Sequence, residues 1–323
     1  MKKSKIVLSI LMSCVLCACS ANEPAGSKDE KIRIVTTVFP AYDWCREIIG
    51  DNPGDIDLSF LMNSGSDLHS FQPSADDIMK IAEADLFVYV GGESDEWVKD
   101  ALKQTVNPDS KALSLMEILN QLVKEEEIVE GMEADHEEEH DHEETEYDEH
   151  VWLSLRNAEA ACANLAQYIS EIDPEHADVY SENVQNYVAA LSGLDGEYID
   201  TVANAETKTL LFADRFPFRY LTDDYNLEYY AAFAGCSAET EASFETVIFL
   251  ADKTDELSLK HVMCIEGSDE KIAKTVIENT VSKNQNILHL DSMQSTTLQD
   301  VNAGTTYLSI MEKNLEILKE ALN

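Results

Sequence analysis

Basic residues are scarce in this chain. Only 23 Lys and Arg stand against 63 Asp and Glu, which gives the 323 residues a formal net charge of −40 at pH 7. A surface this acidic repels nucleic acid and anionic lipid headgroups, and it attracts cations. We therefore expect no nucleic-acid partner and no membrane contact through the folded surface.

Cysteine is also sparse. Beyond the N-terminal segment only Cys45, Cys162, Cys236 and Cys264 remain, far apart and without a Cys-x-x-Cys pair. That spacing argues against a zinc site built from thiolates. Buried free thiols are the expected state, although a location outside the cytoplasm would allow disulfides, whose pairing the sequence leaves open.

Long hydrophobic runs are absent apart from one near the N-terminus. That run follows three early Lys residues and ends in Leu-Cys-Ala-Cys at Cys19. The order is typical of a secretory signal peptide, and the last four residues resemble a bacterial lipobox. We expect residues 1–19 to be the signal peptide, with a lipid on Cys19 rather than on Cys14. Residues 20–30 would then tether the protein outside the bacterial cell membrane, through this lipid alone.

Sequence motifs of catalysis are scarce as well. The chain has no GxSxG and no Walker loop, which are signatures of common hydrolases and nucleotide-binding enzymes. Its one match to HExxH, at residues 136–140, stands within a run of acidic residues that has no apolar helical pattern. We therefore expect a binding protein and not an enzyme. A metal-dependent hydrolase stays as an alternative, because a sequence does not reveal whether a zinc site keeps the open position that hydrolysis needs.

Short apolar runs alternate with helical stretches in two blocks, which predicts α/β lobes with parallel sheets and helices on both faces. In the first block we expect strands at 32–38, 56–61 and 86–90, and helices at 41–49, 74–84 and 96–103. In the second block we expect strands at 209–212, 228–233, 261–265 and 286–290, and helices at 216–224, 241–254, 269–281 and 305–322.

Two long helical stretches with few Gly, 157–172 and 175–203, separate the blocks, and Pro174 between them can start the second helix. Ligands of such sheets bind outside the carboxyl ends of the strands, so a cleft between the lobes is the expected site. The predicted domains are an N-terminal lobe (31–153) that includes an acidic loop (124–149), a helical connector (154–205) and a C-terminal lobe (206–323).

The acidic loop is rich in histidine. His136, His140 and His142 stand in it among many Asp and Glu, and His150 directly follows it. Imidazole is the commonest metal ligand, and carboxylates add oxygen donors that suit zinc, manganese or iron. A run this polar cannot bury apolar surface. We therefore predict both a disordered loop and contact of some of these His with metal.

Further candidate ligands stand where predicted strands end. Glu266 and Asp291 each directly follow a predicted strand, Asp214 follows the apolar run TLLFA, and His69 lies between a strand and a helix start. With His150, these residues come from separate elements and could converge on one point, because ligands bind at the carboxyl ends of parallel strands.

Several segments resemble the extracytoplasmic metal-binding proteins of ABC importers, in their zinc-uptake branch. Those proteins have a His before Glu-Pro-x-Pro, and this chain has His69-Ser-Phe-Gln-Pro-Ser. They have Asp-Pro-His-Val-Trp-Leu before a long helix, and this chain has Asp-Glu-His-Val-Trp-Leu ending at Leu153. They also have an acidic, His-rich loop just before that second His. The segments ADLFVYVGG and AKTVIENT match in character, so the resemblance covers nearly the whole mature chain.

The resemblance implies two α/β lobes joined by one long helix, with zinc bound between them. It implies His69 and His150 as ligands, and an Asp after a late strand, which Asp291 fits. It implies a monomeric receptor that delivers zinc to an ABC permease and its ATPase subunit. A manganese-type receptor, a surface adhesin and an extracellular metal buffer stay as alternatives.

The chain departs from the family at one position. The family has a His, or a Glu in manganese-type members, ahead of an aromatic-x-Tyr pattern that opens the second lobe. Aligning residues 218–220 with that pattern puts Arg215 at the ligand position. Arg is a permanent cation and does not bind metal.

Three outcomes stay open for this position. Asp214 could turn inward as the ligand, which we favour, or a water could fill the position. Alternatively, Arg215 could pair with a neighbouring acid while another carboxylate binds the metal; the candidates for pairing are Asp291 and Glu266, and those for binding are Glu239 and Glu241.

The ligand types favour zinc. Two His with one or two carboxylates satisfy tetrahedral zinc, whereas manganese prefers more oxygen ligands, and nickel and copper stay open. We expect the histidines of the loop, His136, His140 and His142, to form an auxiliary site that captures zinc near the cleft. Because a ligand His must be deprotonated, we expect binding to weaken below about pH 6.

Overall fold

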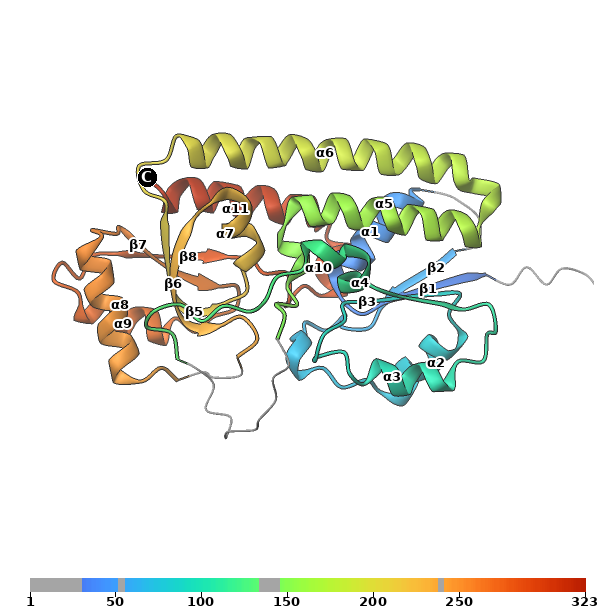
Figure 1. Ribbon diagram of the computed structural model, residues 1–323, viewed down its shortest axis with the longest axis horizontal. Coiled ribbons are helices and arrows are strands. Elements are labelled where there is room, and N and C mark those ends of the chain that lie inside the picture. Colours follow the sequence, from blue (N-terminus) through green and yellow to red (C-terminus); the bar gives the residue numbers. More distant parts are fainter. Residues whose placement is uncertain (1–30, 52–55, 134–145, 238–240) are drawn as a thin grey trace, which may run out of the picture. The chain divides into compact units, whose positions relative to one another are not determined.

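The structure contains two parallel β-sheets, and the carboxyl ends of their strands are where ligands of such sheets bind. The computed structural model describes residues 31–51, 56–133, 146–237 and 241–323, and within them the strands form two four-stranded sheets (Figure 1). Every neighbouring pair of strands in both sheets is parallel. The prediction of two parallel-sheet α/β lobes is therefore confirmed.

The first sheet has the strand order β2-β1-β3-β4. Its elements are β1 (Ile32–Thr36), α1 (Phe39–Ile49), β2 (Ile56–Phe60), α2 (Ala75–Glu83), β3 (Leu86–Tyr89), α3 (Val98–Ala101), β4 (Lys111–Ser114) and α4 (Leu115–Leu119). The start of α2 follows from its sequence. Ser74 accepts the backbone N–H of Asp77, and the Asp77 carboxylate accepts that of Ser74, so this capping box satisfies two donors at the helix end.

The second sheet has the strand order β6-β5-β7-β8. The lobe built on it contains β5 (Thr209–Phe216), α7 (Arg219–Tyr225), β6 (Glu228–Ala234), α8 (Phe244–Glu256), β7 (His261–Ile265), α9 (Lys271–Asn279) and β8 (Asn286–Leu290). Helix α10 (Leu298–Asn302) follows in the chain and starts against the first lobe, where the Leu298 N–H donates to the Asn63 carbonyl. Glu266 and Asp291 directly follow β7 and β8, as predicted.

Strand β5 is longer than its apolar run predicts. Phe212 and Arg215 pair with Ala231 and Phe233 of β6, so β5 has one residue more than its partner over this stretch. Such a bulge bends the strand and changes where its side chains point. Asp214 was predicted to follow the strand, and this is wrong, because it lies within β5 at the bulge.

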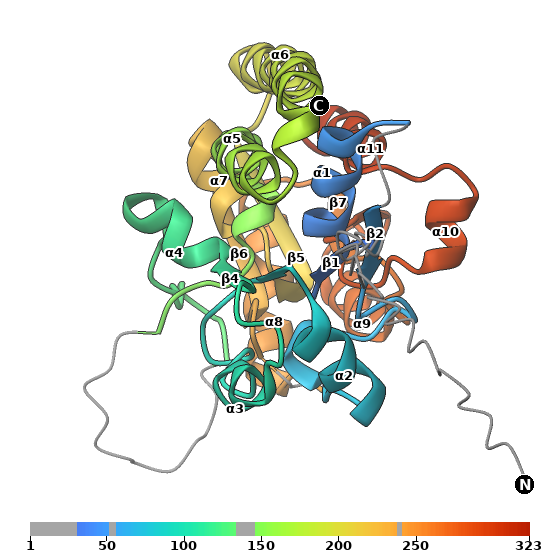
Figure 2. The same cartoon turned by 90° about the vertical axis from the view of Figure 1, so that its right-hand side faces the viewer.

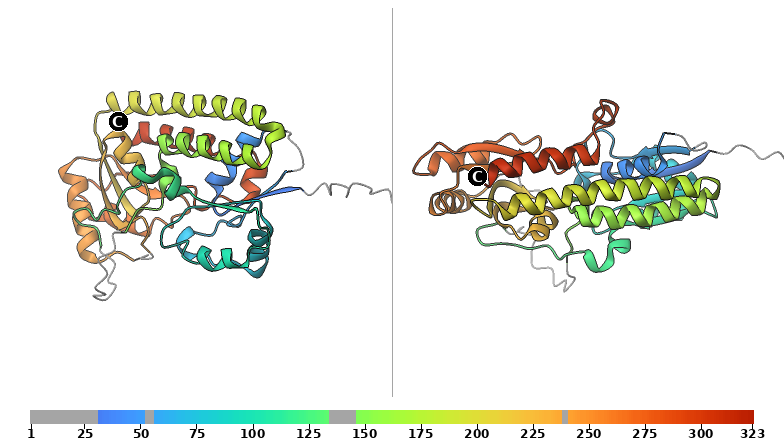
Figure 3. Two further views of the ribbon diagram at one scale, coloured as in Figure 1. Left: turned by 45° about the vertical axis from the view of Figure 1, so that its right-hand side comes forward. Right: turned by 90° about the horizontal axis from the view of Figure 1, so that it is seen from above.

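Three helices gather on the same side of both sheets (Figures 1 and 2): α5 (Leu155–Ile172), α6 (Ala177–Ala203) and α11 (Tyr307–Ala321). Helix α6 packs against α1 of the first lobe and α7 of the second, and also against α5 and α11. Seen from above, α11 runs beside α6 (Figure 3). Pro174 begins a short 3-10 turn ahead of α6, so the predicted helix break is confirmed.

The two lobes share one hydrophobic core. Trp44 of α1, Phe212 of β5 and Tyr307 of α11 belong to the same cluster of buried side chains. Residues 31–323 accordingly form one compact unit. The predicted domain boundaries within this unit stay a prediction.

The sequence did not predict β4 and α4. Strand β4 has four residues at the edge of the first sheet, and two of them are buried, so it has too short an apolar pattern to be recognised. Among the described residues, no helix is long and apolar enough to cross a membrane. In the same part of the chain all four Cys are free, as expected, and all but Cys236 are buried.

Candidate metal site

His69 lies on the segment between β2 and α2. It is the middle residue of a 3-10 turn, in which the preceding Leu68 is buried. The Asp67 carboxylate caps this turn by accepting the His69 backbone N–H at 3.0 Å. The ring Nδ1 lies 2.7 Å from Ser94 Oγ. Because Nδ1 is engaged in this way, Nε2 is the atom that faces the second histidine.

His150 is completely buried ahead of the 3-10 turn Val151–Leu153. Its Nδ1 lies 2.9 Å from Asp148 Oδ1, and the same oxygen accepts the His150 backbone N–H at 2.8 Å. An ionised carboxylate only accepts hydrogen bonds, so in the neutral ring Nδ1 carries the proton and Nε2 has the lone pair that can bind a metal. Metal-binding histidines are commonly oriented by a carboxylate in this way.

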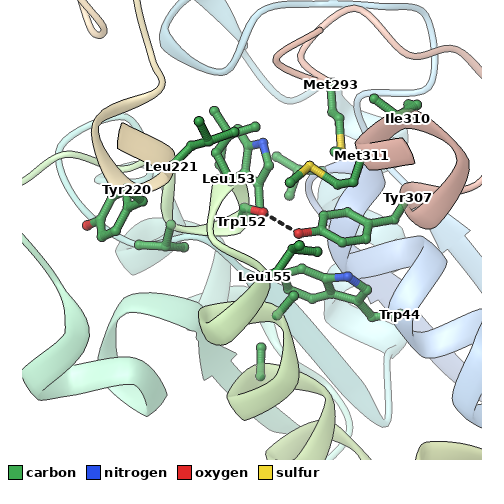
Figure 4. Close-up of a cluster of buried hydrophobic side chains, with 14 of the residues drawn as sticks. Trp44, Trp152, Leu153, Leu155, Tyr220, Leu221, Met293, Tyr307, Ile310 and Met311 are labelled. Carbon is green, nitrogen blue, oxygen red and sulfur yellow. Dashed lines mark hydrogen bonds between the residues drawn. The ribbon is translucent and has the colours of Figure 1, made fainter. Parts of the chain in front are cut away.

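The turn that follows His150 is held by the second half of the chain. The indole N–H of Trp152 donates to the Ser292 carbonyl at 2.9 Å, and the Tyr307 hydroxyl donates to the Trp152 carbonyl at 2.7 Å (Figure 4). The Tyr220 hydroxyl donates to the carbonyl of Asp148 at 2.7 Å. The aromatic residues around the Val-Trp-Leu motif therefore fix the position of the imidazole.

The two imidazoles meet at a distance that suits a shared metal ion. His69 Nε2 and His150 Nε2 are 3.3 Å apart. Two nitrogens that are each about 2.0–2.1 Å from a tetrahedral zinc would be roughly 3.3–3.4 Å apart. A cation between the two rings would satisfy both lone pairs.

Burial and nearby charges shift the pKa values of the two imidazoles in opposite directions. Burial, the neighbouring His150 and Arg215 lower the pKa of His69 to about 3, against the opposing charge of Asp67. Burial also acts to lower the pKa of His150, but the charge and hydrogen bond of Asp148 outweigh it and the pKa is raised. His69 is therefore neutral at pH 7, which is the form that binds metal.

A third donor, which the sequence did not indicate as a ligand, lies beside this pair. Among the described residues, Sγ of Cys236 and one ring nitrogen each of His69 and His150 all lie within 4.8 Å of one another. Cys236 follows β6, at the carboxyl end of a strand. Ligands bind at the carboxyl ends of parallel strands, and this rule, which indicated Asp291 as a candidate ligand, could also have indicated Cys236.

The three predicted carboxylate ligands bind backbone groups nearby. Asp291 Oδ1 accepts the backbone N–H two residues further along at 2.8 Å. Glu266 accepts the N–H and the hydroxyl of Ser292 at 2.7 and 2.8 Å. Asp214 Oδ1 accepts the N–H of the next residue at 2.9 Å. Within the described part of the chain these carboxylates are not grouped with the histidine pair, and their role as ligands stays a prediction.

Arg215 is bound to the first lobe. Its Nη2 lies 2.8 Å from Asp67 Oδ2, and its Nη1 lies 3.5 Å from the Ser237 carbonyl. Pairing with Asp291 or Glu266 was one expectation, and it is wrong, because the guanidinium binds the Asp67 carboxylate instead.

The predicted cleft between the lobes is present. A cavity of about 480 Å³ is lined by His69 on one side and by residues of the second lobe, including Arg215 and Glu266, on the other. His150 is fully buried and does not line this cavity. An ion that enters through the cleft would therefore meet His69 first.

The acidic tract is described only at its two ends. The Glu126 N–H donates to the Glu146 carbonyl at 3.0 Å, which joins these ends, and the Glu133 N–H donates to the Ala232 carbonyl of β6 at 3.0 Å. Glu133, the last described residue of the first half of the acidic loop, therefore lies against the edge of the second sheet. Five candidate residues lie outside the described part: Cys19, His136, His140, His142 and Glu239.

Known proteins resemble this chain over almost its full length. The family described as "Zinc-uptake complex component A periplasmic" (ZnuA) matches residues 34–321. The high-affinity zinc uptake system protein ZnuA of Bacillus subtilis is 31% identical over 98% of this chain and 97% of its own length. The zinc-binding lipoprotein AdcA of Streptococcus pneumoniae is 30% identical over 99% of this chain. The chain spans only 61% of the length of that relative.

A solved structure shows the same arrangement of elements. The Zn(II)-bound ZnuA-like domain of Streptococcus pneumoniae AdcA matches with a TM-score of 0.69 at 26% identity, over 90% of this chain and 99% of that domain.

Proposed function

This chain belongs to the family of periplasmic zinc-uptake components, and we propose that it is an extracytoplasmic receptor that captures zinc and delivers it to an ABC-type permease. The observation that carries the proposal is the 3.3 Å separation of His69 Nε2 and His150 Nε2. The names of its relatives, a zinc-binding lipoprotein and a zinc-uptake protein, support the same function.

His69 and His150 are the proposed zinc ligands. Each ring is oriented through Nδ1, by Ser94 in one case and by Asp148 in the other. Orientation by outer hydrogen bonds lowers the entropy that binding costs and raises ligand basicity. Two nitrogen donors also favour zinc over manganese, which prefers oxygen ligands.

Carboxylates would complete the coordination only after local rearrangement. Asp291, Asp214 and Glu266 remain predicted ligands, and each would first have to release the backbone hydrogen bonds that it now accepts. Such a release would couple zinc binding to a change in the loops at the carboxyl ends of β5, β7 and β8.

The finer parts of the proposal concern location and partners. A lipid on Cys19 would hold the receptor at the membrane, beside a permease and its ATPase, where a monomer can deliver one ion at a time. The family consists of transport components, so we propose no enzymatic activity. Adhesion and metal buffering stay predictions from the sequence.

The His-rich tract is proposed as an auxiliary site. It starts against the edge of the second sheet and ends at His150, so its histidines are covalently close to the cleft. Weak zinc binding by these histidines would raise the effective concentration of zinc beside the cleft.

Zinc titration against a competing chelator tests the proposal. We expect one tight site per chain, which His150→Ala abolishes and His69→Ala weakens strongly. His289→Ala is the matched control, because His289 is partly exposed beside Glu270, away from the pair, and it should leave affinity unchanged. In a strain that lacks the gene, wild-type protein should restore growth at scarce zinc and His150→Ala should not. Restoration by both would contradict the proposal.

A further inference from the structure

The loop after β6 brings a thiol from the second lobe to the histidine pair. Sγ of Cys236 and a ring nitrogen each of His69 and His150 lie within 4.8 Å of one another. The three side chains come from three separate segments of the chain, and His150 is completely buried. Convergence of two nitrogens and a sulfur at this range is typical of zinc sites with mixed ligands.

Gly235 makes this approach possible. A Cβ at this position would lie 2.9 Å from the Phe216 carbonyl oxygen and 3.1 Å from His150 Cε1. A larger residue would push the loop away from both. The loop is also held from the other side, because Glu126 accepts the Cys236 backbone N–H at 3.3 Å. The backbone is therefore positioned closely against the imidazole, with the thiol on the next residue.

Arg215 cannot act as a ligand in this site. A guanidinium has donors only and stays charged, and here it binds the Asp67 carboxylate at 2.8 Å. It lies on the same side of the cleft as the Cys236 loop, since its Nη1 is 3.5 Å from the Ser237 carbonyl. The second lobe therefore presents a fixed cation and a thiol at the position where the resemblance leads us to expect a histidine.

We propose that Cys236 is a zinc ligand, which binds the ion together with His69 and His150. The inference rests on the proposed function and adds a thiolate to it. A zinc–sulfur bond of about 2.3 Å would place the sulfur roughly 3.5 Å from each ligand nitrogen. As that bond forms, the S–H bond breaks and the proton passes to solvent, because a coordinating thiol is deprotonated.

A thiolate changes the selectivity of the site. Soft sulfur donors favour zinc, cadmium and copper(I), whereas manganese prefers oxygen. The receptor should therefore discriminate against manganese more strongly than a site with nitrogen and oxygen donors alone.

Cobalt(II) substitution tests the proposal directly. Cobalt bound to a thiolate shows a sulfur-to-metal charge-transfer band in the near ultraviolet, which nitrogen and oxygen ligands do not produce. We expect this band in the wild-type protein, displaced by one equivalent of zinc. It should disappear in Cys236→Ser and remain in Cys264→Ala, the matched control on strand β7 of the same sheet.

Zinc affinity gives an independent measurement. Cys236→Ser and Cys236→Ala should each lose more than the roughly 10- to 100-fold that follows removal of an outer partner of a ligand. Circular dichroism and thermal unfolding of the metal-free variants check that they fold. Restoration of affinity by Arg215→His in the Cys236→Ala background would support the replacement of one ligand by the other.

The outcomes separate this inference from the proposed function. Tight zinc binding without a charge-transfer band, or with the same band in Cys236→Ser, would overturn the thiolate ligand and leave the receptor intact. Absence of zinc binding in the wild-type protein would overturn both. The charge-transfer band is measured in the wild-type protein, so misfolding of a variant cannot account for its absence.

Discussion

Arg215 of strand β5 and Asp67 of the first lobe bind each other across the cleft, with Nη2 and Oδ2 2.8 Å apart. The other oxygen of Asp67 caps the turn that carries His69. The ion pair therefore connects the second lobe to the segment that presents one of the proposed ligands. It also places a positive charge close to a site that we expect to bind a cation.

Asp67→Asn should weaken both the fold and zinc binding. The amide oxygen can still cap the turn, but it leaves the guanidinium of Arg215 without its ionic partner. We expect the free energy of unfolding to fall by about 1–3 kcal/mol. Zinc affinity should fall as well, because the unpaired cation repels zinc. Urea unfolding and zinc titration measure the two effects. Asp100→Asn, which removes an exposed ion pair with Lys103, should change neither.

Asp148→Asn should weaken zinc binding with little change in fold. The amide oxygen still accepts the His150 Nδ1–H, but it lacks the charge that raises the basicity of the ring. We expect about a 10- to 100-fold loss of affinity at pH 7, measured by competition with a chelator. Asp43→Asn changes another buried carboxylate, on α1, and should leave the affinity unchanged.

The same variant should shift the pH dependence. Asp148 raises the pKa of His150, so protons compete with zinc as the pH falls through that raised pKa, and affinity drops. Without the charge of Asp148 the pKa falls, and the acid-induced loss of affinity should begin at a lower pH. An unchanged onset in titrations between pH 5 and pH 7 would show that another group controls it.

Tyr307→Phe should destabilise the protein. The Tyr307 hydroxyl is fully buried and donates to the Trp152 carbonyl at 2.7 Å. Its removal leaves that carbonyl without this donor, and we expect the free energy of unfolding to fall by about 1–2 kcal/mol. Urea unfolding measures the change. Tyr147→Phe, at an exposed tyrosine, should have no measurable effect.

Asp43 should make stability fall as the pH rises through a defined window. Burial, partly offset by Arg46, raises the pKa of Asp43 from 3.8 to about 6. Between these values the folded state binds a proton that the unfolded state has released, so the free energy of unfolding decreases as the pH increases. Asp43→Asn removes this dependence.

Relative to wild type, the Asp43→Asn variant should gain about 2–3 kcal/mol in going from pH 4 to pH 7. Urea unfolding at several pH values measures the difference. Parallel stability curves for the two proteins would show that the carboxyl titrates normally in the folded state.

Deletion of residues 134–145 should separate capture from tight binding. We expect the tight site to keep its affinity, because its proposed ligands lie elsewhere, while the total zinc bound at saturation and uptake at scarce zinc both fall. Replacing His136, His140 and His142 by Gln keeps the charge of the tract and tests the imidazoles alone. Unchanged stoichiometry and uptake after deletion would exclude the auxiliary site.

Local sequence patterns were enough to predict the fold class and most helices and strands. Apolar periodicity and helix capping are local, so β8 and the start of α2 were predicted to within a residue. Strand β4 was missed because its apolar pattern is too short. The end of β5 was misplaced, because Asp214 and Arg215, just before its last residue, are polar and belong to a bulge that only the pairing with β6 reveals.

The tertiary structure decided the composition of the candidate site. His69 and His150 are 81 residues apart in the chain, and the resemblance to the zinc-uptake proteins indicates both as ligands. Local pattern could not show that Arg215 binds Asp67. Nor could it show that the predicted carboxylates accept hydrogen bonds from nearby backbone groups, or that Cys236 lies close to the two histidines. A metal site depends on which loops meet at the ends of the strands, and that meeting is set by the packing of the two lobes around their shared core.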